Sequence, residues 1–247
     1  MNETTINLIT ALAIASVIGL MAVLKESRIR ALIYTLPIPI SIALIATGGV
    51  VSSLNLVGLI FVGFFIWGVY YLYEHKNWNI LVADIILAIL YVIFAYIFTQ
   101  NISLPYVVSA VAFLFLWFVL VLFVRNHHVV ARPRTQNKLP AWAKTLIVFG
   151  MAYVLLALKG HIAGFVVTFP FSGVFAVYEG RDMLRVLGTI IIRNSIAIWA
   201  FFTSIHLISG YLGEWASLLL GWVVFGIVLI LVTKLVPLGG VGKTSPN

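Results

Sequence analysis

Arg193 is the residue of this chain whose type and position most clearly suggest chemistry. It lies in the run LGTIIIRNSIAIWAFF, about ten residues from either end of a predicted membrane span. An arginine at that depth costs at least ~2.5 kcal/mol on insertion scales, so it marks a functional site by default. Helical spacing puts Thr189 and Ser204 on its face, and Asn194 adds an amide beside it. We expect these four polar side chains to bind an anionic group of a small solute.

The same arginine also has a purely structural interpretation. It could pair with a buried carboxylate, or bond to helix-end carbonyls that nearby prolines leave without their usual donors. Its partner in the internal repeat described below is Gly63, so a binding site built on it would present a single cation. Such an asymmetric site would suit a solute with one anionic group.

Two carboxylates, Asp84 and Glu214, stand near the beginnings of predicted helices. The helix dipole stabilises a carboxylate in the first turns, and this explanation suits Glu214, which lies close to the membrane interface. Asp84 sits deeper, in NWNILVADIILAIL. A proton-coupled carrier needs a buried carboxylate that can hold a proton. Asp84 is our candidate for proton coupling, and Glu214 is a second candidate for gating or coupling.

Two proline-bearing runs interrupt segments that are otherwise apolar enough for a membrane. Residues 35–48 read TLPIPISIALIATG, with Pro37 and Pro39, and residues 168–180 read TFPFSGVFAVYEG, with Pro170. Proline removes a backbone donor and clashes with the preceding helical turn. We expect these prolines to break their helices, with the freed carbonyls buried in protein or lining a polar cavity. An ordinary proline kink is the alternative.

The composition is that of an integral membrane protein. Of the 247 residues, 63% are hydrophobic and 9% are charged, whereas soluble domains have roughly 25% charged residues. Mean hydropathy is +1.15, which leaves too little polar surface to cover a soluble globule. The absence of cysteine excludes disulfides and thiolate chemistry. The formal net charge of +8 indicates loops at an anionic membrane surface rather than a nucleic-acid partner.

Nine apolar runs approach the ~20 residues that a membrane-crossing helix needs. They cover about 6–24, 30–47, 55–73, 79–99, 105–124, 143–158, 161–178, 186–206 and 211–233. If the N-terminus lies outside, the loops and tail that face the cytoplasm hold thirteen of the 15 Lys and Arg residues, and Lys159 alone lies outside. This positive-inside pattern predicts an all-α, polytopic helix bundle in the cell (inner) membrane, with a cytoplasmic C-terminus.

The two proline runs belong to a longer internal repeat. At an offset of 133 residues Pro37 aligns with Pro170, and at 130 residues Asp84 aligns with Glu214. One span between two four-helix repeats reverses the second repeat, and inverted repeats of this kind build alternating-access transporters. The predicted units are a first repeat (1–100), a linker helix with a basic cytoplasmic loop (101–142), a second repeat (143–235) and a flexible cytoplasmic tail (236–247).

The second repeat resembles the GlpM-like family of small bacterial membrane proteins. The matching positions lie in KGHIAGFVVTFPFSGVFAVYEG and are Lys159, Ile162, Ala163, Gly164, Phe169, Pro170 and Gly180. The resemblance covers about 90 residues of a family of four-helix chains, and it implies that this chain is a fused, inverted pair of such units. It implies no particular activity. Small multidrug exporters are also four-helix units, but here Glu3 and Glu26 flank the first span, so their glutamate chemistry is not carried over.

These observations favour a secondary transporter or permease for a small, anionic solute, working around a midplane site at the repeat interface. A non-transporting accessory or assembly subunit of an envelope pathway is the first alternative, and an intramembrane lipid-modifying enzyme is the second. The sequence has no nucleophile–base pair and no histidines at metal-ligand spacing. We therefore expect no enzyme activity, no catalytic residue, no metal and no cofactor. The expected partners are the lipid bilayer and the solute, with a homodimer left open.

Overall fold

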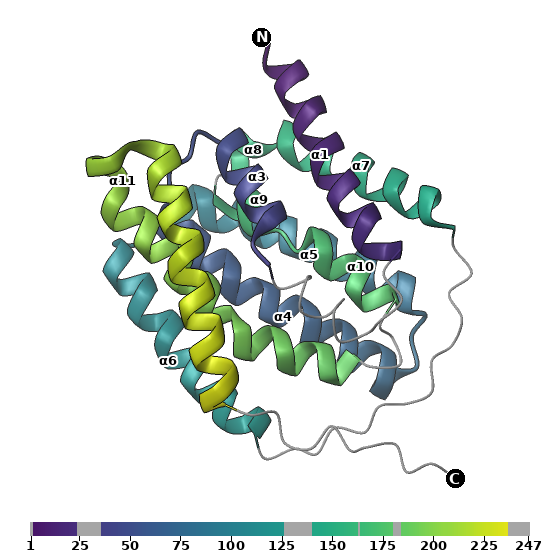
Figure 1. Cartoon of the computed structure of the whole chain (residues 1–247). Helices are drawn as coiled ribbons and strands as arrows, with labels where there is room; N and C mark the ends of the chain where they lie inside the picture. The colour runs from purple at the N-terminus through teal and green to yellow at the C-terminus, as the bar shows by residue number, and fades with distance from the viewer. Residues whose placement is uncertain (1, 24–35, 126–139, 163, 180–183, 237–247) are drawn as a thin grey trace.

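Helices form nearly all of the part of the chain that the computed structural model describes, residues 2–23, 36–125, 140–162, 164–179 and 184–236, and these residues contain no strand. A helix satisfies its backbone groups within one segment, which an apolar run in a membrane requires. Figure 1 shows the arrangement. The helices are α1 (Glu3–Val23), α3 (Ile38–Ala46), α4 (Ser53–Lys76), α5 (Ile80–Asn101), α6 (Tyr106–Arg125), α7 (Ala141–Ala157), α8 (Lys159–Ile162), α9 (Gly164–Thr168), α10 (Phe171–Glu179) and α11 (Leu184–Leu235).

In the part of the chain that the structure describes, four helices are long and apolar enough to cross a membrane, namely α4, α5, α11 and the stretch Glu3–Leu20 of α1. Shorter apolar runs occur in α6 and α7. The prediction of an all-α chain with membrane-spanning helices is therefore confirmed for the described residues, whereas the count of nine spans and the repeat stay predictions. Most of the basic loop and the tail, and the beginning of the predicted span 30–47, lie outside the described residues.

The long helix α11 consists of two arms that fold back on each other. Gly213 separates them with φ 74° and ψ 172°, a backbone conformation that favours glycine. Figure 1 shows the first arm, residues 184–212, and the second arm, residues 214–235, running in opposite directions. Their inner faces meet where Phe201 packs edge-on against Trp222, with ring centroids 6.4 Å apart.

Helix α4 is central, because it contributes side chains to each of the three larger hydrophobic clusters. Figure 1 shows it crossing the middle of the molecule. One cluster joins α1 to α7 and α9, a second joins α3 to both arms of α11, and a third joins α5 to α10. The linker helix α6 packs on α4 and α11 and exposes a row of apolar side chains, among them Val107, Val111 and Phe115.

The segment with Pro170 is divided into three short helices, of which α9 and α10 pack on α4 and α8 packs on α5. Helix α9 ends at Thr168 and α10 begins at Phe171, so the helical ladder is interrupted around Pro170. The close approach of α9 to α4 depends on Gly164, since a Cβ there would lie 2.9 Å from the backbone nitrogen of Asn55. In the other proline run, α3 starts directly after Pro37 and is only nine residues long.

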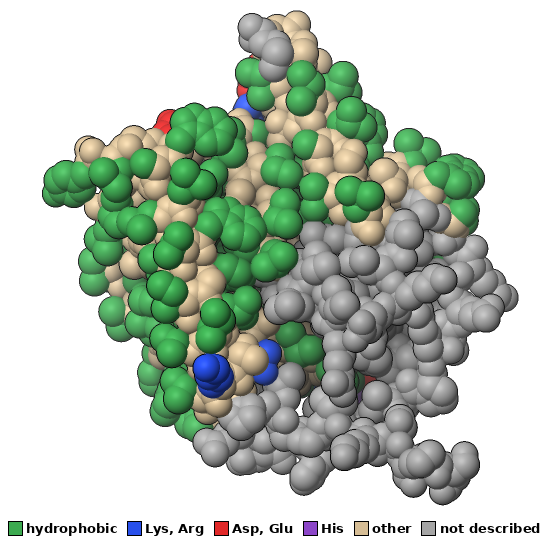
Figure 2. Space-filling model, viewed as in Figure 1, with side chains coloured by type: hydrophobic (Ala, Val, Ile, Leu, Met, Phe, Trp, Pro, Cys, Tyr) green, Lys and Arg blue, Asp and Glu red, His purple; other side chains and the backbone are tan. Residues whose placement is uncertain are grey.

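The outer surface is that of a protein surrounded by hydrocarbon. Figure 2 shows hydrophobic side chains over most of the described part of one face, with few charged atoms among them. The side chains of Phe64, Phe115 and Leu219 are 63%, 71% and 69% exposed. Water would not solvate such a surface, whereas lipid chains would.

Candidate functional site

One internal cavity brings the two proline runs together. Its volume is about 60 Å³, and it lies between α3, α4, the α9–α10 break and the first arm of α11. The lining residues are Leu36, Pro39, Ile40, Leu59, Val62, Ile66, Thr168, Phe169, Pro170, Gly173, Ile191, Asn194 and Ile198. A water needs roughly 15 Å³ of such space, so the cavity is the size of a few waters. We call it the central cavity.

Two polar side chains face the central cavity, Thr168 and Asn194. Thr168 is 3% exposed and Asn194 is 1% exposed, so both lie deep in the protein. The remaining walls are aliphatic or aromatic. A small polar solute could therefore be held by one hydroxyl and one amide within an otherwise dry enclosure.

Helix α9 is held at the cavity by hydrogen bonds from two other helices. The hydroxyl of Tyr91 on α5 donates to the Phe165 carbonyl at 3.2 Å and lies 3.0 Å from the Thr168 hydroxyl. Asn55 on α4 donates from its amide to the Gly164 carbonyl at 3.1 Å. These bonds satisfy groups that a short, interrupted helix leaves exposed, as an apolar environment requires. Sequence reasoning missed Tyr91 and Asn55, because only the folded contacts distinguish them from other polar residues.

Arg193 lies beside the central cavity, but it is Asn194 that lines the cavity wall. The Arg193 Nε donates to Asn194 Oδ1 at 3.0 Å, so the guanidinium orients the amide. Trp117 of α6 donates to the Ile192 carbonyl at 2.9 Å and anchors the same turn from the other side. Among the residues that the structure describes, no carboxylate lies within ion-pair distance of Arg193.

The structure does not bring the other two predicted binding residues to the cavity. The Thr189 hydroxyl donates to the Arg185 carbonyl at 2.8 Å, and the Ser204 hydroxyl donates to the Phe201 carbonyl at 2.9 Å. Both donors are thus used within their own helix. Ser204 also lies about 16 Å from Arg193 along the helix axis, so it belongs to a different level of the bundle.

The two predicted carboxylates occupy unlike environments. Asp84 is 4% exposed, and its neighbour Ala83 packs in the cluster between α4, α5 and α10. Glu214 is exposed, directly after the break at Gly213, and its side chain lies against Gly49 in the loop after α3. They are therefore separate features of the molecule rather than two parts of one site.

Lys159 forms a polar cluster that the sequence did not predict. Its Nζ lies 3.5 Å from Glu3 Oε1 of α1, and it donates to Asn7 Oδ1 at 3.2 Å and to the Ala46 carbonyl at 3.3 Å. The lysine thereby ties α8 to α1 and to the end of α3. The sequence offered one indication of this role, because Lys159 is the single Lys or Arg residue on the predicted outer side. We call Glu3, Asn7 and Lys159 the outer cluster.

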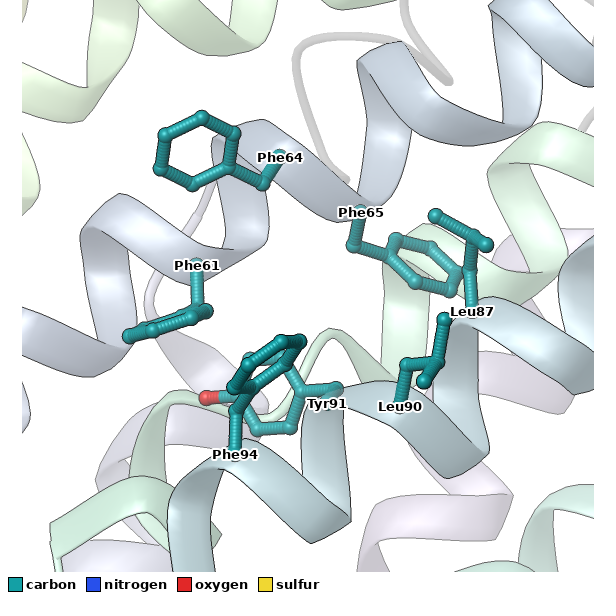
Figure 3. Close-up of a pocket in the computed structure, with 7 residues that line it drawn as sticks. All are labelled: Phe61, Phe64, Phe65, Leu87, Leu90, Tyr91 and Phe94. Atoms are coloured by element: carbon teal, nitrogen blue, oxygen red, sulfur yellow. The ribbon is translucent and has the colours of Figure 1, made fainter. Parts of the chain in front are cut away.

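A second, larger pocket opens on the surface between α4 and α5. It has a volume of about 320 Å³, and Figure 3 shows the side chains of Phe61, Phe64, Phe65, Leu87, Leu90, Tyr91 and Phe94 around it. Its lining is almost entirely apolar. We regard it as a groove in the hydrocarbon-facing surface, and it offers no group that could bind a charged solute.

The described residues contain no group of three or more His, Asp or Glu side chains placed to hold a metal ion. Comparisons of the chain with models of protein families, with characterised proteins and with solved structures found no significant match.

Proposed function

We propose that this protein is a secondary transporter or permease for a small, anionic solute, and that the solute binds in the central cavity. The observation that carries the proposal is that Pro39, Pro170 and Asn194 line one internal space, although they are far apart in the sequence. Interrupted helices that meet inside a membrane bundle are typical of the substrate sites of secondary transporters. Arg193 supplies the positive charge, acting on the solute through Asn194 or after a small movement of its own side chain.

Contacts between matched helices support the inverted repeat that the proposal needs. Helix α1 packs on α7, α3 packs on α9, and α4 packs on α11, and each pair joins corresponding positions of the two predicted repeats. An axis in the membrane plane that relates two inverted units brings such equivalent helices together. We propose the fused, inverted pair of GlpM-like units on these grounds, with the N-terminus outside the cell membrane.

A further correspondence links each proline run to the last helix of the opposite repeat. Tyr91 of α5 lies 3.0 Å from the hydroxyl of Thr168, two residues before Pro170. Trp222 of the second α11 arm donates to the hydroxyl of Ser41 at 3.0 Å, and Ser41 donates to the Pro37 carbonyl at 2.7 Å. In each case a side chain of one predicted repeat forms a hydrogen bond in the proline run of the other repeat.

The small size of the central cavity favours a second candidate, a non-transporting accessory or assembly subunit. A space of about 60 Å³ is smaller than most metabolites, so a transporter must move α3 or α10 to admit its solute. An accessory subunit would need no such movement. An intramembrane enzyme acting on lipid is the third candidate, and no observation on the described residues favours it.

Flux measurements on the purified protein in proteoliposomes test the leading proposal. A panel of small organic and inorganic anions would be screened by counterflow with the wild type, Asn194→Leu, Arg193→Met and the surface control Lys234→Met. We expect flux of at least one anion, a loss of tenfold or more in the Asn194 and Arg193 variants, and wild-type flux in the control. If Arg193→Met folds and transports normally, the proposed binding site is wrong.

A further inference from the structure

Asp84 has a buried carboxyl oxygen, Oδ1, that finds no hydrogen-bond partner among the described residues. The residue is 4% exposed. It is the fifth residue of α5, beyond the first turn whose free N–H groups stabilise carboxylates. A permanently charged carboxylate in this position would be costly, because burial removes it from bulk water and no ion pair with a described residue compensates it.

The described helices that pack on α5 near Asp84 contribute an apolar cluster, whose titratable groups are phenols. Ile80 and Ala88, which lie one turn before and one turn after Asp84 on α5, pack in this cluster. The same cluster includes Val69 of α4, Val177 of α10 and Leu184 of α11. Its titratable members are Tyr70 and Tyr73 of α4 and Tyr178 of α10, and Arg185 follows Leu184 on α11. Asn79, the exposed N-cap residue of α5, lies about 7 Å away along the helix axis, so water is near.

Helix α10 contacts both α5, which carries Asp84, and the central cavity. Its residue Gly173 lines the cavity together with Pro170, whereas Val174 and Val177 pack in the cluster that contains Ala83, the neighbour of Asp84. Asp84 also shares a face of α5 with Tyr91, two turns further on. Tyr91 in turn contacts Thr168 at the helix break. A change of charge at Asp84 therefore acts on both ends of the α9–α10 break.

We propose that Asp84 is a proton-binding site and that its protonation controls the position of α10 beside the central cavity. The carboxylate takes one proton from the aqueous phase at the start of α5 and becomes a neutral carboxylic acid, which this apolar pocket accommodates. Loss of the proton leaves a charge beside the apolar cluster, and water that enters to solvate this charge displaces Val174 and Val177 of α10 from the cluster. The role of Asp84 in coupling solute movement to protons rests on the proposed function, whereas the proton binding itself does not.

Infrared spectroscopy of the protein in lipid tests the proton binding without any solute. Difference spectra between wild type and Asp84→Asn would be recorded from mildly acidic to alkaline pH, with Glu214→Gln as the matched control. We expect a carboxylic-acid carbonyl band that disappears as pH rises, is absent from Asp84→Asn and is retained in Glu214→Gln. A band that is missing at every pH, or present at every pH, would overturn the proposal.

A transport experiment then separates this inference from the proposed function. Once an anion transported by the wild type is known, the Asp84→Asn variant should no longer accumulate that anion when a pH gradient is applied. It should still exchange the anion across the membrane at equal pH. If Asp84→Asn still accumulates solute with the gradient, coupling by Asp84 is wrong while the transporter proposal survives. If Asp84 titrates but no anion is transported by the wild type, the transporter proposal fails while the proton site stands.

Discussion

At the scale of single residues, the central cavity depends on polar groups that hold a short helix against its neighbours. The sequence pointed to Arg193, because a guanidinium in an apolar run is easy to recognise. It could not show that Asn194 lines the cavity while Arg193 bonds to it, because that depends on the rotation of α11 within the bundle. Helices that are apolar on all sides give no periodicity from which to read this rotation.

Tyr91→Phe should destabilise the protein by about 1 kcal/mol, because it removes the bonds to Thr168 and to the Phe165 carbonyl and leaves both groups buried. The ring contacts with Phe165 and Phe169 would be retained. Thermal unfolding in detergent measures the change. Tyr96→Phe on the exposed side of the same helix is the control and should leave the midpoint unchanged. Equal midpoints for the two variants would contradict the assigned role of Tyr91.

A methyl group at Gly58 should separate α4 from α9 or distort them. The added Cβ would collide with the Thr168 hydroxyl and lie 3.1 Å from the Tyr91 hydroxyl. Overpacking of this kind costs roughly 1–3 kcal/mol. Gly63→Ala in the same helix is a matched control, since a Cβ there meets nothing within 4 Å. We expect Gly58→Ala to lower the unfolding midpoint and Gly63→Ala to leave it unchanged or raise it. A lower midpoint for Gly63→Ala than for Gly58→Ala would refute the close approach of α9 to α4.

At the scale of helices, the apolar runs predicted where helices lie, and the prolines predicted where to look for interruptions. Pro170 stands between α9 and α10, and Pro37 stands at the start of α3. A helix start or break at a proline can be predicted from the sequence alone, since proline lacks a backbone donor wherever it occurs. The outer cluster was not predictable, because Glu3 and Lys159 are far apart in the sequence and meet only after α1 packs beside α8 and α3.

Lys159→Met should loosen α1 from α3 and α8. The exposed ion pair with Glu3 contributes little by itself, about 0–1 kcal/mol, whereas the bonds to Asn7 and to the Ala46 carbonyl are less exposed. We therefore expect Lys159→Met to increase proteolysis or hydrogen exchange in α1 several-fold more than Glu3→Gln does. Hydrogen exchange followed by mass spectrometry resolves the two variants. If Glu3→Gln has the larger effect, the ion pair rather than the carbonyl and amide contacts holds the outer cluster.

At the scale of the whole molecule, the central claim is that two halves enclose the central cavity and open it alternately to either side of the membrane. Composition predicted a membrane bundle, because an exterior this apolar suits only lipid. The location of the cavity followed from packing between distant segments, which no local pattern of residues encodes. The inverted arrangement of the halves and the transport activity are proposals. Both predict that the central cavity can be reached from either side of the membrane.

Accessibility of single cysteines is the most direct measurement, since the natural chain has none. Val62→Cys and Ile198→Cys place a thiol on two walls of the central cavity, and Phe115→Cys on α6 is a lipid-facing control. A membrane-impermeant thiol reagent would be applied to each side of the membrane separately. Labelling of both cavity positions from either side, with no labelling of the control, is the predicted result. Labelling from one side only, or from neither, would contradict alternating access, and labelling from neither would favour the accessory subunit.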